Sequence, residues 1–262
     1  MSDTLQIVIE QRVARIALNR SALHNAFDDA LIADLTDALA RMGAHPGVHA
    51  VVLTGNGASF SAGADIEWMR RMAKASEADN RADSERLAAL MRTLNFLPKP
   101  TIARVNGAAF GGGVGLVACC DIAIAADNAK FSLSEVKLGL VPAVISPYVV
   151  AAIGLRQARR LFLTGEAIEA AEAVRIGLVH HVVAAADLDA AVSRQLDLLG
   201  KGGPLAQREA KALALRIDDM RADEAGTIDR DNAALIARLR VSAEGQEGLA
   251  AFLDKRKPDW IE

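Results

Sequence analysis

The spacing of apolar residues predicts that the chain begins with a hairpin and a helix. Gln6–Glu10 and Val13–Leu18 each alternate as strands do, and the polar turn between them predicts a β-hairpin. Apolar residues then recur at helical spacing over Leu31–Met42, after a first turn that begins with Asp28. We therefore expect an amphipathic helix that ends at Gly43.

The next part of the chain continues to alternate strands and helices. Val48–Thr54, Thr101–Val105 and Asp121–Ala125 are apolar runs that predict buried strands. Leu87–Leu97 has the spacing of an amphipathic helix that stops before a proline. The charged segment Glu67–Asp83 has weak periodicity and is predicted to be mobile.

Downstream of Arg156 the pattern is almost entirely helical. Within that part, only Leu178–Val183 predicts a strand. The change of pattern near Gly154 separates an α/β part from a helix-rich part, without a linker rich in Pro, Gly or Ser between them. The pattern as a whole places the chain in the α/β class.

Three consecutive glycines, Gly111-Gly112-Gly113, open a short apolar helix directly after a β-rich stretch. Glycines at a helix start leave backbone N–H groups bare, which makes a site for a negative oxygen of a phosphate, a dinucleotide or an oxyanion. These glycines fit neither the Gly-x-Gly-x-x-Gly nor the P-loop signature, and no Gly-x-Ser-x-Gly frames a nucleophilic serine. The oxyanion interpretation is therefore favoured.

Composition argues against a nucleic-acid-binding, a membrane or a metal-binding protein. The 262 residues are 52% apolar with a net charge of −3, and Lys and Arg are scattered, so we expect no nucleic-acid partner. There is no signal-peptide pattern and no apolar run of membrane-spanning length, so we expect a cytoplasmic protein that contacts no membrane. The neighbours Cys119 and Cys120 suit a helix core in a reducing compartment, and the five histidines show no metal-ligand spacing.

Several short motifs follow one another in a specific order along almost the whole chain. Their combination resembles the enoyl-CoA hydratase/isomerase (crotonase) superfamily. The motifs are Phe60-Ser61-Ala62-Gly63-Ala64-Asp65, Lys99-Pro100-Thr101-Ile102-Ala103, Asn106-Gly107, the glycine run, Cys120-Asp121-Ile122, Phe131-x-x-x-Glu135-x-x-x-Gly139 and Phe252-x-x-Lys255-Arg256.

The resemblance implies a fold, an assembly and a substrate class. The fold is a crotonase-like α/β spiral of ββα units, expected here over residues 1–195, with a helical C-terminal region over residues 196–262 that mediates trimers, often paired into hexamers. The substrates are acyl-CoA thioesters. Coenzyme A is then part of the substrate, and no separate cofactor is expected.

The resemblance also assigns the chemistry. When a thioester becomes an enolate, negative charge gathers on one oxygen, and the family pattern holds it with two backbone amides, here those of Ala64 and Gly112. Glu135 matches the superfamily glutamate that carries the proton, and partial burial should raise its pKa. A surface carboxylate paired with Lys130 or Lys137 is the alternative for Glu135.

Further residues are expected to bind the CoA thioester. In the family the backbone around residues 62–66 cups the adenine, and basic residues near Arg20 and Lys255 approach the CoA phosphates, although Lys255 could equally belong to a solvated charge run. The segment after Arg20 lacks the proline frequent in the family. The expected substrate-binding residues are Arg20, Ala62, Ala64, Asp65, Ile66, Gly111, Gly112, Pro142 and Lys255.

One position departs from the pattern of two-glutamate hydratases. Gly115 stands where those enzymes carry their second catalytic glutamate. The stretches Phe110–Leu116 and Leu133–Pro147 resemble a bacterial subgroup of methylglutaconyl-CoA or isohexenylglutaconyl-CoA hydratases, which also have glycine there. Those substrates bear a carboxylate, for which the nearest cations in the sequence are Arg70, Arg71 and Lys74.

The function expected from these residues is hydration of a 2-enoyl-CoA, branched or methylglutaconyl-like, in leucine or terpenoid breakdown. The first alternative is a Δ3-Δ2 enoyl-CoA isomerase with Glu135 as its sole base. The second is a non-catalytic subunit that binds acyl-CoA or RNA, against which the net charge of −3 argues.

Overall fold

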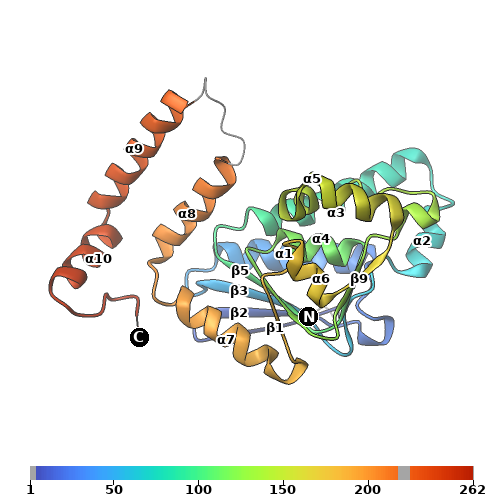
Figure 1. The fold of residues 1–262 in the computed structure, drawn as a ribbon, viewed down its shortest axis with the longest axis horizontal. Coiled ribbons are helices and arrows are strands. Elements are labelled where there is room, and N and C mark those ends of the chain that lie inside the picture. Colours follow the sequence, from blue (N-terminus) through green and yellow to red (C-terminus); the bar gives the residue numbers. More distant parts are fainter. Residues whose placement is uncertain (1–3, 218–224, 262) are drawn as a thin grey trace. The chain divides into compact units, whose positions relative to one another are not determined.

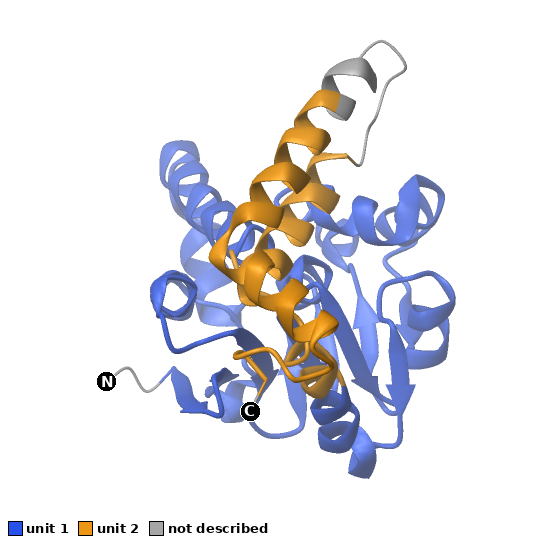
Figure 2. Cartoon of the chain, turned by 90° about the vertical axis from the view of Figure 1, so that its left-hand side faces the viewer, with its two compact units in different colours: residues 1–97, 101–194 blue, residues 98–100, 195–262 orange. Residues whose placement is uncertain are grey.

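The computed structural model describes residues 4–217 and 225–261. The chain forms two compact units, which we call unit 1 (residues 1–97 and 101–194) and unit 2 (residues 98–100 and 195–262) (Figure 2). The boundary falls inside helix α7 (Leu188–Leu199), and Gly154 does not separate the units. With a φ of 72°, it interrupts helix α5 (Ser146–Thr164) instead.

Unit 1 contains a six-stranded sheet in the order β1-β2-β3-β5-β7-β10. The predicted hairpin is confirmed, because β1 and β2 pair antiparallel, while every other pair in this sheet is parallel. The strands are β1 (Leu5–Glu10), β2 (Val13–Leu18), β3 (Ala50–Gly55), β5 (Thr101–Val105), β7 (Ile122–Ala126) and β10 (His181–Val183).

A second sheet in unit 1 has four strands in the order β4-β6-β8-β9. Each strand has three residues; β4, β6 and β8 are parallel, and β9 is antiparallel to β8. The strands are β4 (Ser59–Ser61), β6 (Ala108–Phe110), β8 (Lys130–Ser132) and β9 (Ala167–Glu169). The sequence pattern did not predict β9, because three residues are too few to show a period.

Four helices of unit 1 gather on one side of the six-stranded sheet, where α1 packs on α3, α3 on α4 and α4 on α5 (Figure 1). The predicted first helix is confirmed, and Asp28 caps it by accepting a hydrogen bond from Leu31 N. The helices before α7 are α1 (Asp29–Ala44), α2 (Ile66–Met72), α3 (Glu77–Asn95), α4 (Gly112–Cys119), α5 and α6 (Ala170–Arg175), with 3-10 turns η1 (Ser21–Leu23), η2 (Glu135–Leu138) and η3 (Ala185–Asp187).

The charged segment Glu67–Asp83 is largely helical despite its weak periodicity, and its mobility stays a prediction. It forms α2 and the first turns of α3. Asp65 caps α2 through the amides of Glu67 and Trp68, and Ser76 caps α3 through the amide of Asp79. The periodicity is weak because much of this segment's surface is exposed, whereas each helix start is fixed by its capping side chain.

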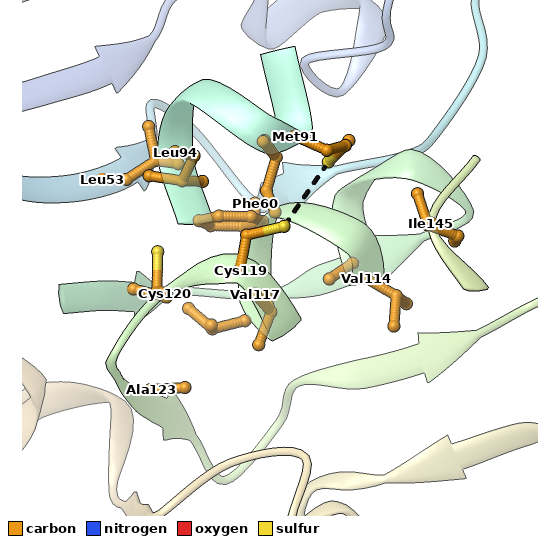
Figure 3. Packing of buried hydrophobic residues seen from close by; sticks show 14 of the residues in the cluster. Leu53, Phe60, Met91, Leu94, Val114, Val117, Cys119, Cys120, Ala123 and Ile145 are labelled. Carbon is orange, nitrogen blue, oxygen red and sulfur yellow. Dashed lines mark hydrogen bonds between the residues drawn. The ribbon is translucent and has the colours of Figure 1, made fainter. Parts of the chain in front are cut away.

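The core of unit 1 lies between the helices and the sheet. Leu53 of β3, Phe60 of β4 and Leu94 of α3 are fully buried or nearly so, and they lie together in Figure 3. The two cysteines are also buried, as expected, and Cys119 Sγ lies 3.9 Å from the sulfur of Met91. Small and polarisable side chains let α4 approach its neighbours closely.

Unit 2 consists of the end of α7 with helices α8 (Pro204–Arg216), α9 (Ala225–Val241) and α10 (Ala243–Leu253). The carboxylate of Glu244 accepts hydrogen bonds of 2.7 Å from the first amides of α8, those of Leu205 and Ala206. A helix N-terminus leaves these donors unpaired within the helix, so Glu244 joins α10 to α8. Among the described residues, no helix has the length and apolar character needed to span a membrane.

Candidate active site

The short parallel sheet brings three distant motifs together. β4 leads into the Ala62–Asp65 turn, β6 into the glycine run that opens α4, and β8 into Glu135. The carboxyl ends of parallel strands lie at one edge of a sheet, which is where ligands bind in open α/β folds. Strand pairing therefore explains why motifs about 70 residues apart in sequence form one site.

A cavity of about 1020 Å³ opens at this edge. Its wall includes Ala62, Ala64, Gly111, Gly112, Glu135 and Pro142, all of them residues that the sequence assigned to the site. The remaining wall is mostly apolar and comes largely from α2, α3 and the segment 138–145.

The amide of Ala64 is held by its neighbours. Phe27 N donates to Gly63 O at 2.7 Å, and Asp65 N donates to Phe27 O at 2.8 Å. These two bonds flank Ala64, whose own N–H has no partner among the described residues. Gly63 has a φ of 86°, so the turn that presents this amide requires glycine.

Gly112 is the residue predicted to supply the second amide. It is the first residue of α4, where an N–H group has no partner within the helix and lies at the positive end of the helix dipole. A Cβ on Gly112 would lie 3.0 Å from the ring of Phe27, the residue that also holds Ala64. A Cβ on Gly63 would lie 3.0 Å from Phe110 O, so the two motifs are in contact.

Glu135 stands beside both glycine motifs. A Cβ on Gly111 would lie 3.2 Å from Glu135 Oε1 and 3.9 Å from the Cα of Gly63. The other carboxyl oxygen, Oε2, is buried and has no hydrogen-bond partner among the described residues. Burial raises the pKa of Glu135, and a hydrogen bond from its own backbone amide offsets this only in part.

The place beside α4 where a second carboxylate would stand is occupied. A Cβ on Gly115 would overlap Ile145 Cγ2 and lie 3.2 Å from Met91 Cε. Ile145 is 3% exposed at the start of α5, and Figure 3 shows it on the α4 side of the core near Val114. Glu135 is thus the carboxylate that stands beside the amide pair.

The sequence model of the enoyl-CoA hydratase/isomerase family matches residues 8–262. The chain belongs to this family. An enoyl-CoA hydratase from Shewanella pealeana has the same fold, with a TM-score of 0.94, 45% identity, and coverage of 98% of this chain and 96% of that one. The superfamily resemblance and the crotonase-like fold are therefore confirmed, including the helical C-terminal region.

Two curated relatives are similar over nearly their full length. The crotonyl-CoA hydratase of Syntrophomonas wolfei is 35% identical over 254 residues, which are 96% of this chain and 95% of the relative. The 2,3-dehydroadipyl-CoA hydratase of Escherichia coli is 35% identical over 253 residues, which are 96% of each chain. The methylglutaconyl subgroup stays a prediction.

Arg20 and Asp65 form an ion pair next to the turn that contains Ala64. The guanidinium of Arg20 pairs with Asp65 at 3.0 Å and Asp28 at 2.9 Å, and donates to Ala26 O at 2.5 Å. Burial alone would raise the pKa of Asp65, but hydrogen bonds from Trp68, Glu67 and Arg20 hold it below its ordinary value. These contacts fix the turn that presents Ala64, and a contact of Arg20 with CoA stays a prediction.

Other predicted residues lie outside the cavity wall. Ile66 is 68% exposed on the first turn of α2, and Lys255 belongs to unit 2, after the end of α10, so their contacts with CoA stay predictions. The three cations considered for a substrate carboxylate are not in the wall either. Arg70 pairs with Glu67, Arg71 with Asp29, and Lys74 is exposed.

Sequence reasoning missed the contribution of α2 and α3 to the cavity. Trp68 of α2 and three polar residues of α3, Asn80, Asp83 and Ser84, line it. The available signal was the tryptophan within a polar segment, since a large aromatic side chain is unusual on a solvated helix. Within residues 4–217 and 225–261, no three His, Cys, Asp or Glu side chains gather as a metal site would require.

Proposed function

We propose that this protein hydrates a 2-enoyl-CoA thioester. The observation that carries the proposal is the placement of Glu135, with one buried unpartnered carboxyl oxygen, beside the two glycine motifs that present the amides of Ala64 and Gly112. The names of the relatives, all hydratases of enoyl-CoA substrates, support the same reaction.

The amides of Ala64 and Gly112 bind the thioester oxygen. Addition of hydroxide at C3 pushes electrons onto that oxygen, and the two donors stabilise the resulting enolate. Removing one such donor costs about 3 to 4 kcal/mol of transition-state stabilisation in other enzymes. The dipole of α4 acts in the same direction. Because Gly112 has no side chain, the thioester can approach the helix start closely.

Glu135 carries the proton. In its ionised form it takes a proton from water as the water oxygen bonds to C3, and it then returns a proton to C2 as the enolate collapses. The raised pKa of Glu135 suits both steps, because a group that accepts and then returns a proton works best when its pKa lies closer to the working pH. Ile145 fills the place at Gly115, so the two transfers are assigned to one carboxylate.

A Δ3-Δ2 enoyl-CoA isomerase is the second candidate, and the Gly115–Ile145 contact is what favours it. Moving a proton from C2 to C4 needs one base and the same enolate-binding amides. The two reactions differ in whether water enters the product.

The acyl chain and the assembly are further parts of the proposal. The mostly apolar wall suits a short or branched acyl chain, and a methylglutaconyl-like chain would add a distal carboxylate. We propose a homotrimer or a pair of trimers, with a cytoplasmic role in leucine or terpenoid breakdown. The native mass in solution tests the assembly.

Labelled water separates the two reactions. The protein is incubated with crotonyl-CoA, and separately with a 3-enoyl-CoA, in water enriched in oxygen-18. A hydratase gives 3-hydroxybutyryl-CoA that carries the label, whereas an isomerase gives unlabelled 2-enoyl-CoA from the second substrate alone. Failure of a panel of 2-enoyl-CoAs to gain label would overturn the hydratase proposal.

A further inference from the structure

Three large apolar side chains on one short segment are exposed at the cavity. Leu138, Leu140 and Val141, which we call the apolar rim, are 59%, 58% and 71% exposed and belong to the cavity wall. Exposed apolar side chains that gather at one place mark a surface that binds a ligand or a partner. Because the surface of these three residues is accessible, an apolar group in the cavity can contact them directly.

The apolar rim is tied to the backbone of the candidate proton carrier. Leu140 N donates to Glu135 O at 3.0 Å, and Gly139 N donates to Val136 O at 3.2 Å. These bonds close the turn that follows Glu135. A group bound at the rim is therefore held at a defined place relative to Glu135 by a short and rigid connection.

The chemistry of the thioester indicates which part of the substrate meets the rim. With the carbonyl oxygen at the amides of Ala64 and Gly112, proton transfer by Glu135 requires C2 and C3 beside that carboxyl. The acyl chain beyond C3 then starts beside Glu135 and runs away from the thioester, whereas the CoA sulfur is attached on the other side of C1. The rim begins three residues after Glu135 and lines the same cavity, so it suits the acyl chain.

The rest of the wall offers no partner for a negative charge. Met69 and Met72 of α2 are partly exposed there, and flexible methionine side chains adapt to apolar groups of different shape. Among the residues that the structure describes, the wall contains no Lys, Arg or His, and its acidic residues are Glu135 and Asp83. Arg86, which is not in the wall, already pairs with Asp83 at 2.8 Å. A carboxylate at the end of the acyl chain would leave water without meeting a free cation, which is unfavourable.

We infer that the apolar rim binds the acyl chain beyond C3 and selects uncharged apolar chains over chains that end in a carboxylate. The inference rests on the proposed hydratase function. It favours a linear or branched apolar chain over a methylglutaconyl-like one.

Three saturated thioesters test the selectivity on the wild-type protein. Butyryl-CoA, hexanoyl-CoA and adipoyl-CoA have no 2,3 double bond, so calorimetry measures their binding without turnover. Two further methylenes, half to fully removed from water, should make hexanoyl-CoA bind about four- to fifteenfold more tightly than butyryl-CoA. Adipoyl-CoA, which has a carboxylate in place of the terminal methyl group, should bind at least about tenfold more weakly than hexanoyl-CoA. Adipoyl-CoA that binds as tightly as hexanoyl-CoA would overturn the inference.

A triple variant tests the residues. Leu138→Ala, Leu140→Ala and Val141→Ala together should reduce the preference for hexanoyl-CoA over butyryl-CoA to less than about twofold, and should change butyryl-CoA binding less than about twofold. The matched control is Leu155→Ala with Leu163→Ala, because these leucines of α5 are 64% and 72% exposed and are not in the wall. The control should keep the wild-type preference. A rim variant that keeps it too, or that weakens both thioesters equally, would overturn the inference.

Oxygen-18 uptake from labelled water by hex-2-enoyl-CoA, measured on the same proteins, separates this inference from the proposed function. In the wild type, kcat/KM should be higher for hex-2-enoyl-CoA than for crotonyl-CoA, and the rim variant should lose that difference. Hydration without chain selectivity would overturn the inference and leave the hydratase proposal intact. Chain-selective binding without hydration would overturn the hydratase proposal and leave the assignment of the rim intact.

Discussion

Replacing Gly115 by alanine tests whether Ile145 occupies the place of a second carboxylate. The new Cβ would overlap Ile145 Cγ2 and lie 3.0 Å from Ile145 Cβ, against 3.4 to 4 Å for an ordinary contact. Ile145 is 3% exposed, so it has little room to move. Overpacking of this kind costs about 1 to 3 kcal/mol, and the better helix propensity of alanine returns about 1 kcal/mol. We expect a net loss of up to about 2 kcal/mol in the free energy of unfolding.

A double-mutant cycle isolates the contact. Ile145→Ala alone should cost about 2 to 5 kcal/mol, because it leaves a cavity. In the double variant with Gly115→Ala the overlapping methyl is gone, so this variant should be about 1 to 3 kcal/mol more stable than the sum of the single effects predicts. Ile145→Val is the matched control, since valine keeps both groups on Cβ and so keeps the clash.

The required free energies come from urea unfolding followed by circular dichroism. The proteins compared are the wild type, the three single variants, and Gly115→Ala combined with Ile145→Ala or with Ile145→Val. Additive effects of Gly115→Ala and Ile145→Ala would refute the steric argument. Relief of the Gly115→Ala effect by Ile145→Val would refute it as well, because the methyl assigned to the clash is still present in that variant.

Three further variants follow from the same contacts. Burial raises the pKa of Glu135 above 4.5, so the folded protein loses stability as the pH rises and this carboxyl has to ionise. Glutamine does not ionise, so the Tm of Glu135→Gln should rise relative to that of the wild type between pH 4 and pH 8. A Tm difference between the two proteins that is the same at both pH values would argue against a buried carboxyl. Asp65→Ala should lose about 1 to 2 kcal/mol with the cap of α2, whereas Asp65→Asn keeps an acceptor and should lose less, as urea unfolding can show. Arg256 lowers the pKa of Glu247 from 4.5 to about 2, so this pair stabilises unit 2 at neutral pH and stops doing so as pH falls toward 2; Glu247→Gln should flatten that part of a Tm profile, and an unchanged profile would contradict the pairing.

The sequence predicted those elements whose period is carried by buried residues. Helix α1 followed from Leu31, Leu35 and Leu39, and β2 of the hairpin from Ile16 and Leu18, all of which are fully buried. The helical segment after Asp65 was missed because capping, not burial, defines its start. The second sheet is held by three-residue strands that pair across long stretches of sequence, so neither its pairing nor β9 could be read from local patterns.

The candidate site also contains residues that local motifs predicted and contacts that depend on tertiary packing. The amides of Ala64 and Gly112 depend on local glycine geometry, and Glu135 follows a short strand, so short motifs indicated all three. The contact of Ile145 with Gly115 joins residues 30 apart and depends on how α5 packs on α4. Trp68 was missed for a related reason: the tryptophan is visible in the sequence, but which cavity it lines depends on tertiary packing.

The central claim is that Glu135 alone carries the proton in a hydration at the Ala64 and Gly112 amides. The most direct test is the rate at which crotonyl-CoA gains oxygen-18 from labelled water, compared between wild type and Glu135→Gln, with CoA-thioester binding measured on both proteins. We predict that wild type gives labelled 3-hydroxybutyryl-CoA and that Glu135→Gln binds the thioester but loses at least about a hundredfold in rate. A Glu135→Gln rate within about twofold of wild type would contradict the account.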